Sequence, residues 1–307
     1  MLEQHEIGNF WKDVKNKKRV CMYRDCNEPA INSHVLQKNG VLDQVAENDH
    51  VIMLQENLYS ENLGQAHEFK PVGLNNAYSF KGFCKNHDDQ VFKEIEKDTE
   101  IVFTPYQQAL FAYRSLCNEL YRKELVYEMS GKLLREHMMD PFLIAHRDGS
   151  SVGIEQMKKF KTILETSLIE SDFSTLDLFF SETQHVEVCI STLLNIGDQK
   201  IGTFKLPAAV VLNIFPWGSK TIIMMCSLKG RSSRWISRKK SIFETGKASK
   251  QIKAINEILT LRAEFWAMSN SLYQTIPKEE LDAYLSISFK ESLNHNESFS
   301  STITFIS

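Results

Sequence analysis

Two short pairs of metal-ligand residues lie in the first third of the chain. Four residues separate Cys21 from Cys26, and two separate Cys84 from His87. Zinc takes soft or borderline ligands in a tetrahedron, and structural sites draw them from two tight turns that each point two side chains at one place. In a reducing cytosol such pairs favour a metal over disulfides. The sequence therefore predicts one structural zinc ion, held by Cys21, Cys26, Cys84 and His87.

Two alternatives to this ligand set stay open at the level of sequence. The two pairs are 57 residues apart and could be unrelated. Other histidines in the same region, His5, His50 and His67, are rival fourth ligands. The remaining cysteines stand alone in apolar stretches and are expected to be core residues, because free cysteine is among the most buried residue types; they are Cys117, Cys189 and Cys226.

The rest of the chain must supply the elements that position these residues. We expect three regions: a turn-rich, zinc-binding region over 1–100, a helical region over 101–170, and antiparallel strands with C-terminal helices over 171–307. Apolar residues recur at helical spacing from 106 to 139. A second helix is predicted from 153 to 169, because Pro141 and the Gly- and Ser-containing run 148–151 interrupt the pattern before it.

Strands are predicted where short runs rich in Val, Ile, Phe and Thr lie between turn residues. These runs are 177–180, 185–194, 201–206, 210–215 and 221–228. No helical pattern lies between them, which favours an antiparallel meander. The helical period returns over 249–268, and Pro277 is expected to open one more helix. The predicted fold class is therefore α+β.

Composition and charge narrow the classes of function. The 307 residues are 42% hydrophobic and 24% charged, with a net charge of −3. A nucleic-acid surface must therefore be a local patch, since the chain as a whole is not basic. There is no run of about 18 apolar residues, and the N-terminal segment has no apolar core typical of a secretory signal. We expect no membrane span and a cytoplasmic location.

Two basic clusters are candidate surfaces for nucleic acid. One lies directly before Cys21, and the other, from 220 to 253, has ten basic residues and one acid, Glu244. Phosphates attract such a surface, and a tryptophan in it can stack on a base. A solvated loop and helix face, or a patch for an acidic partner protein, are the alternatives. The predicted nucleic-acid-binding residues are Lys17, Lys18, Arg19, Arg231, Arg234, Trp235, Arg238, Lys239 and Lys240.

The zinc pairs, the Ser33-His34 dipeptide, the Asn75-Asn76 loop and the polar helix start after Cys84 together resemble a zinc-stabilised HNH (ββα-metal, His-Me finger) endonuclease. The resemblance covers about residues 19–100. It implies a treble-clef or ββα-metal finger in which a β-hairpin and a helix hold a catalytic Mg²⁺ or Mn²⁺, while structural Zn²⁺ braces the hairpin. Such fingers often act in bacterial restriction or anti-phage defence, as one part of a larger assembly with partner proteins.

The same resemblance implies a role for three positions. His34 falls at the general base that activates water, and an imidazole can accept a proton at neutral pH. Asn75 or Asn76 falls at the asparagine that orients this base, and we take Asn76. Asp88 falls at the position that binds the catalytic ion, for which a hard carboxylate is suited. The implied activity is hydrolysis of phosphodiester bonds in nucleic acid.

Two features differ from the family pattern. Ser33 stands where the family often has an acidic metal ligand, and the stretch from Gly40 to Pro71 must be an insertion that loops out. A zinc-finger module that binds nucleic acid or a partner protein without catalysis is therefore the main alternative. A third reading places an enzyme or sensor site in the β region, where no Gly-rich phosphate loop and no nucleophile elbow is present.

Overall fold

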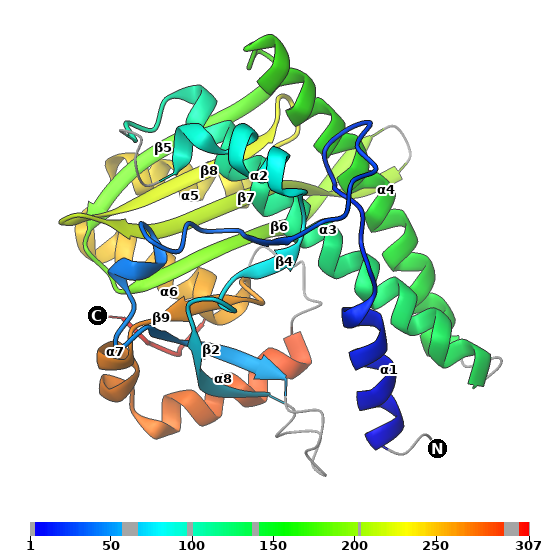
Figure 1. Ribbon diagram of the computed structural model, residues 1–307. Coiled ribbons are helices and arrows are strands. Elements are labelled where there is room, and N and C mark those ends of the chain that lie inside the picture. Colours follow the sequence, from blue (N-terminus) through cyan, green and yellow to red (C-terminus); the bar gives the residue numbers. More distant parts are fainter. Residues whose placement is uncertain are drawn as a thin grey trace.

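A computed structural model describes residues 4–56, 67–96, 101–136, 141–201, 204–291 and 301–306. Within them the chain is α+β, with helices on both faces of an antiparallel sheet (Figure 1). The helices are α1 Gln4–Asn16, α2 Lys85–Val91, α3 Pro105–Glu136, α4 Pro141–Glu170, α5 Arg234–Thr245, α6 Ala248–Leu261, α7 Asn270–Thr275 and α8 Lys278–Glu291. None of these helices is long and apolar enough to cross a membrane.

The strands form two antiparallel sheets. A small one pairs β1 with β4, and a seven-stranded one has the order β3-β2-β9-β6-β7-β8-β5. Only β6, β7 and β8 follow one another as the predicted meander, since β5 pairs with β8 at the far edge and not with β6. The strands are β1 Asn32–His34, β2 His50–Glu56, β3 His67–Gly73, β4 Ser79–Lys81, β5 Leu176–Gln184, β6 Val188–Ile201, β7 Phe204–Trp217, β8 Lys220–Leu228 and β9 Trp266–Met268.

Three predicted boundaries were wrong. The second long helix begins at Pro141, not Gly153, because proline suits a first helical turn. Its two glycines, Gly149 and Gly153, cost only about 1 kcal/mol each inside a long, packed helix. Segment 201–206 is no separate strand, since Ile201 ends β6 opposite Phe204 of β7. The helix predicted to reach residue 268 ends at Leu261, and 266–268 form β9 between β2 and β6.

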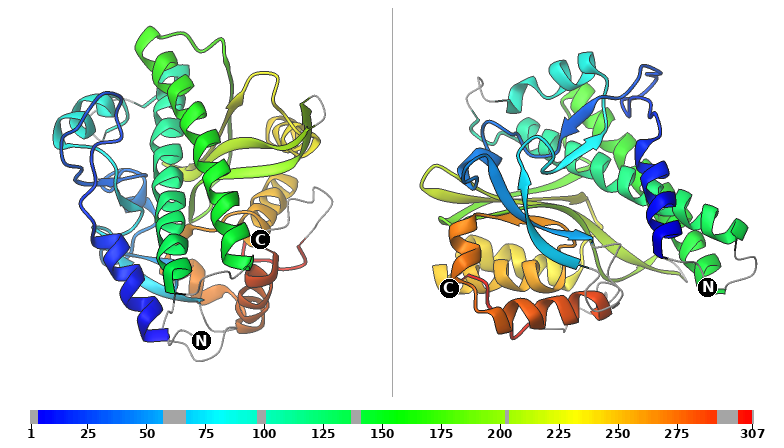
Figure 2. Two further views of the ribbon diagram at one scale, coloured as in Figure 1. Left: turned by 90° about the vertical axis from the view of Figure 1, so that its right-hand side faces the viewer. Right: turned by 60° about the horizontal axis from the view of Figure 1, so that its bottom comes forward.

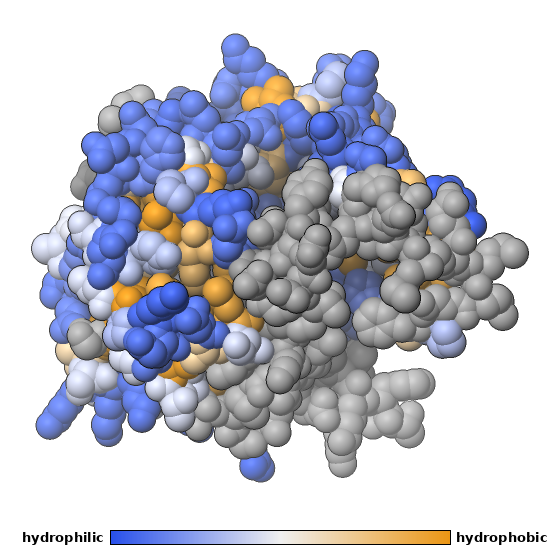
Figure 3. All heavy atoms as spheres, turned by 90° about the horizontal axis from the view of Figure 1, so that it is seen from below, coloured by the Kyte–Doolittle hydropathy of each residue, from blue (hydrophilic) through white to orange (hydrophobic). Residues whose placement is uncertain are grey.

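The large sheet is buried on both faces, and successive side chains point to opposite sides. In β8, Ile222 and Met224 face a core shared with α3 and α4, whereas Ile223 and Met225 face a core shared with α5 and α6. Figure 2 shows these two helical layers with the strands between them. From below, hydrophilic residues cover much of the described surface around a limited apolar area (Figure 3). The buried residues of α5 and α6 share a core with the strands, so these helices turn their apolar faces to the sheet.

The first hundred residues divide between two places in the structure. Residues 19–36 and 74–96, here called the finger, contain the antiparallel β1–β4 pair and α2, and pack on the layer of α3. The stretch predicted to loop out, Gly40 to Pro71, contains β2 and most of β3, which pair with each other and extend the seven-stranded sheet through β9. The division of the chain into three regions stays a prediction.

Tyr78 joins the finger to the large sheet. Its φ of 51° is unusual for a bulky residue. Its hydroxyl lies 2.8 Å from the Cys189 carbonyl oxygen and 3.1 Å from that of Phe265. Burial raises the pKa of Tyr78 well above its ordinary value, so the hydroxyl stays protonated and donates.

We expect Tyr78→Phe to lower the free energy of unfolding by about 1–3 kcal/mol, because it removes the donor and leaves buried carbonyls without it. Urea denaturation of the purified protein measures the change. Tyr121→Phe is the matched control, since the Tyr121 hydroxyl has no hydrogen-bond partner among the described residues. Equal effects of the two substitutions would contradict the assignment.

Candidate functional site

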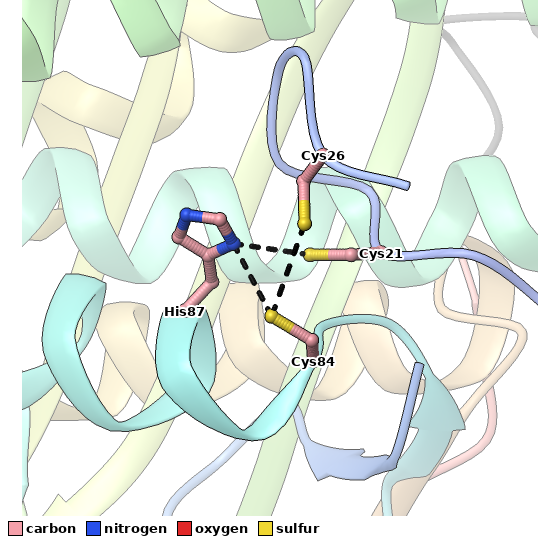
Figure 4. A group of neighbouring side chains, drawn as sticks. All are labelled: Cys21, Cys26, Cys84 and His87. Carbon is pink, nitrogen blue, oxygen red and sulfur yellow. Dashed lines mark hydrogen bonds between the residues drawn. The ribbon is translucent and has the colours of Figure 1, made fainter. Parts of the chain in front are cut away.

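The four predicted zinc ligands come together in the finger. The ligand atoms of Cys21, Cys26, Cys84 and His87 all lie within 4.8 Å of one another. Figure 4 shows the four side chains pointing at one place, two from the loop after α1 and two from the start of α2. This is the one group of three or more Cys, His, Asp or Glu side chains in the described part of the chain that could hold a metal ion.

The spacing of the cluster fits a tetrahedral zinc ion. His87 Nδ1 lies 3.4 Å from Cys21 Sγ and 3.3 Å from Cys84 Sγ, and the Sγ atoms of Cys26 and Cys84 are 3.9 Å apart. With Zn–S near 2.3 Å and Zn–N near 2.0 Å, a tetrahedron has edges of about 3.5–3.8 Å. A Cys₃His set is also a standard structural donor set for zinc. The side chains present therefore suit zinc in both chemistry and geometry.

The first turn is built by local hydrogen bonds. The Cys26 amide donates to the Tyr23 carbonyl oxygen (3.3 Å), and the Cys21 amide donates to the Glu28 carbonyl oxygen (2.8 Å). Asp25 closes the turn with a φ of 56°, a left-handed conformation that Asp tolerates better than most residues. These bonds bring the residues on either side of the turn together, so that both thiols point the same way.

The second turn is the start of α2. Cys84 is the residue that precedes the helix, and the Asp88 amide donates to its carbonyl oxygen at 2.9 Å. Gly82 lets the chain approach the Phe80 ring, because a Cβ at this position would lie 2.5 Å from a ring carbon. Two backbone bonds, from Met22 to Gly82 and from Ile31 to Phe83, then join the two turns.

The cluster thiols differ in acidity. Burial raises the pKa of Cys21 to about 12. Burial also acts to raise the pKa of Cys84, but hydrogen bonds, first among them the one from the His87 amide, outweigh it and lower the pKa. A dication competes with the protons on such thiols, so zinc affinity must rise with pH.

The rival ligands lie elsewhere or outside the described residues. His50 is exposed, and its Nδ1 lies 2.7 Å from the Asn48 carbonyl oxygen. The side chains of His5 and His67 lie outside the described residues. The other cysteines are fully buried core residues, as expected. Burial raises the pKa of Cys117 and of Cys226 to about 12, so both stay as thiols.

His34 ends β1, and its ring is fixed by the loop that precedes β4. His34 Nε2 lies 2.9 Å from the Leu74 carbonyl oxygen. Because a carbonyl can only accept, Nε2 carries the proton, and Nδ1 has no partner among the described residues. Asn76 is exposed in the same loop, where its backbone amide donates to the Gly73 carbonyl oxygen at 2.8 Å. The Asn75 side chain accepts from Lys38 Nζ at 2.6 Å.

Asp88 lies in the first turn of α2 beside a buried arginine. Its Oδ1 is 3.5 Å from Arg114 Nη2, and the Arg114 side chain is 3% exposed. Arg114 also donates to Glu96 Oε1 at 2.9 Å and lies over the Phe92 ring at 4.0 Å. Gln37 donates to the other Glu96 oxygen at 3.3 Å. Sequence reasoning missed this network, although Gln37 lies three residues after His34.

Ser33 has a structural role in the finger. Its side chain is fully buried, and its hydroxyl accepts a hydrogen bond from the Phe83 amide at 3.2 Å. The bond joins β1 to the residue before Cys84. A carboxylate at this position would have to be buried in the same place, at a cost of desolvation. Ser33 is therefore not a metal ligand in this arrangement.

The basic cluster before Cys21 is partly neutralised by α3. Lys17 Nζ lies 2.6 Å from Glu128, and Arg19 pairs with the other oxygen of the same carboxylate. Burial alone would raise the pKa of Glu128, but hydrogen bonds from Arg19 and Lys17 hold it below its usual value. Lys18 is exposed and has no partner among the described residues. The free positive charge here is smaller than the sequence suggests.

Most of the second basic cluster lies in α5 and the start of α6, on the face of the sheet opposite the finger. Two of its predicted contact residues are wrong. Trp235 is 1% exposed and cannot stack on a base, because its ring packs in the core. Lys239 is also 1% exposed and donates to Glu257 at 2.6 Å. Lys240 is paired with Asp177 at 2.7 Å, which leaves Arg231, Arg234 and Arg238 exposed.

These exposed arginines allow a direct test of the α5 surface. The association constant for duplex DNA falls as salt rises, with a negative slope of log K against log salt. We expect Arg234→Gln with Arg238→Gln to reduce the magnitude of this slope by about two, because each phosphate contact contributes nearly one. Fluorescence anisotropy over a salt series measures the slope. Arg135→Gln with Lys159→Gln removes two exposed cations from α3 and α4 and serves as the control. An unchanged slope in the α5 variant would exclude this surface.

Comparison with known proteins gives no family. No protein-family model, no curated protein and no solved structure matches this chain. The function must therefore be argued from the side chains of the finger and from the surfaces around it.

Proposed function

We propose that the chain is a metal-dependent endonuclease of the HNH type, with a structural zinc ion bound by Cys21, Cys26, Cys84 and His87. In this proposal the finger is a ββα-metal unit: β1 and β4 are the hairpin and α2 is the helix. The order of elements supports it, because His34 ends the first strand, Asn76 lies in the intervening loop, and Asp88 lies in the first turn of the helix.

One observation carries the catalytic assignment. The contact between His34 Nε2 and the Leu74 carbonyl oxygen fixes both the ring and the tautomer, which leaves the lone pair of Nδ1 to accept a proton from water. A general base needs this combination of orientation and free lone pair. The carbonyl belongs to Leu74, in the loop where the Asn76 backbone amide donates to the Gly73 carbonyl oxygen. An orienting role for the Asn76 side chain rests on the resemblance alone.

Asp88 would supply a carboxylate oxygen to a catalytic Mg²⁺ or Mn²⁺. Its side chain is 18% exposed, and its ion pair with Arg114 is made through Oδ1. A bound divalent ion stabilises the charge that develops on the leaving oxygen of a phosphodiester. Substrate contacts at the finger are assigned to Lys18. Arg231, Arg234 and Arg238 lie on the opposite face of the sheet and would contact a separate segment of nucleic acid. Nucleic acid is then the substrate, and a role in anti-phage defence as part of a larger assembly belongs to the same proposal.

A second candidate is a zinc-finger module that binds nucleic acid or a protein without catalysis. Two contacts favour it: Asp88 is paired with Arg114, and Ser33 is engaged with the Phe83 amide where the family often has an acid. An arginine beside a carboxylate competes with a metal ion for it. Under this reading His34 only fastens the loop that contains Leu74.

Incubation with nucleic acid separates the two candidates. The full chain, with bound zinc quantified, is incubated with plasmid DNA or with RNA in Mg²⁺, in Mn²⁺ and in EDTA. Cleavage that requires the added ion supports the nuclease. Binding without cleavage, at one zinc ion per chain, supports the module. A chain that neither cleaves nor binds nucleic acid would contradict the nuclease and the module that binds nucleic acid.

A further inference from the structure

A cleft of about 660 Å³ lies beside the cysteine–histidine cluster, between α2 and the facing parts of α3 and α4. The rings of Tyr23 and His87 form one wall, stacked with centroids 4.2 Å apart and planes 24° apart. Tyr106, in the first turn of α3, also lines the cleft, and Phe173 holds its ring edge-on at 6.2 Å. The aromatic walls are therefore fixed by neighbouring side chains.

The charged side chains of the cleft are acidic. Glu94 and Glu165 line it, and no Lys or Arg is among the described residues that do. Glu165 is buried and satisfied, because its Oε1 accepts from the Tyr113 hydroxyl at 2.5 Å and from Lys161 at 2.6 Å. Glu94 is exposed, and its carboxylate has no partner among the described residues. The Glu94 carboxylate can therefore bind a ligand.

The surroundings add to this negative character. Burial raises the pKa of Tyr106, and the charge of Glu94 raises it further. The cluster behind His87 contributes in the same direction, because a zinc ion with three thiolates and a neutral imidazole has one net negative charge. Phosphates and carboxylates are therefore disfavoured in this cleft. The exposed arginines of α5 form a surface of the opposite charge.

We propose that the cleft binds a guanidinium group, and that the group belongs to an arginine side chain of a partner protein. A guanidinium stacks flat on a tyrosine ring and offers parallel donors to a carboxylate, here Glu94. Free arginine has a carboxylate of its own, which Glu94 would repel. An arginine within a polypeptide lacks that charge. This inference does not depend on nuclease activity.

Titration calorimetry of the full, zinc-loaded chain with N-acetyl-arginine amide tests the proposal. N-acetyl-citrulline amide is its neutral isostere and is expected to bind at least about tenfold more weakly. Glu94→Gln is expected to weaken binding of the arginine probe about two- to fivefold, and Tyr106→Leu is expected to weaken it several-fold. Glu244→Gln removes an exposed carboxylate on α5 and is expected to leave binding unchanged.

Three outcomes would overturn the proposal. Equal binding of the citrulline probe would show that charge is not recognised. Equal losses from Glu94→Gln and Glu244→Gln, or no saturable binding of the arginine probe, would remove the site. Tighter binding of free arginine than of the blocked probe would exclude a partner protein as the source. Glu94 is exposed, so its substitution is not expected to impair folding.

Discussion

Replacing Cys84 with serine is expected to abolish zinc binding and to unfold the finger. Cys84 contacts both His87 and Cys26 in the cluster and is buried in the core that the finger shares with α3. Zinc binding contributes about 10–16 kcal/mol to folding in zinc-finger peptides. We therefore expect a loss of more than about 3 kcal/mol in the free energy of unfolding. Elemental analysis of dialysed protein and urea denaturation measure the two effects.

Cys189→Ala is the matched control for this experiment. Cys189 is equally buried but lies in β6, away from the cluster. Its truncation is expected to cost about 1–2 kcal/mol and to leave the zinc content at one ion per chain. Retention of that zinc by the Cys84→Ser protein would contradict the ligand assignment, as would a wild-type chain that binds none.

The second large effect is expected at His34. If the finger is a nuclease, His34→Ala should lower the rate of cleavage by about 10²–10⁴-fold, which is the usual contribution of a general base. Zinc content should not change, because His34 is not among the cluster residues. Single-turnover cleavage of plasmid DNA or RNA, with Mg²⁺ or Mn²⁺, measures the rate. Zinc quantification on the same sample shows that the finger is intact.

His50→Ala is the control, since His50 is an exposed histidine at the start of β2, outside the finger. It should cleave like the wild type. Cleavage by the His34→Ala protein at the wild-type rate would remove His34 from the mechanism. A large rate loss accompanied by loss of zinc would instead indicate a structural role for the histidine in the finger.

The local sequence was sufficient for features that depend on neighbours along the chain. The ligand pairs Cys21–Cys26 and Cys84–His87 were predicted from spacing, because a zinc turn is a local structure whose residue types reflect the chemistry of the ion. The fold then brings the two pairs together. The long helix through Leu116 and the strands around Val211 and Ile223 were predicted from periodicity, for a similar reason. Their boundaries were less secure, as Pro141 shows.

Tertiary structure decided what depends on residues far apart in sequence. The exposure of a charged or aromatic side chain is one such property: Trp235 and Lys239 are buried because α5 packs on the sheet, whereas Arg234 on the same helix is exposed. The Arg114 contact with Asp88 joins α3 to α2, and no spacing predicts it. The sequence by itself thus identified the side chains that could hold a metal ion. Packing determined which of its other polar side chains can meet a ligand, because burial and pairing are set by contacts between distant segments.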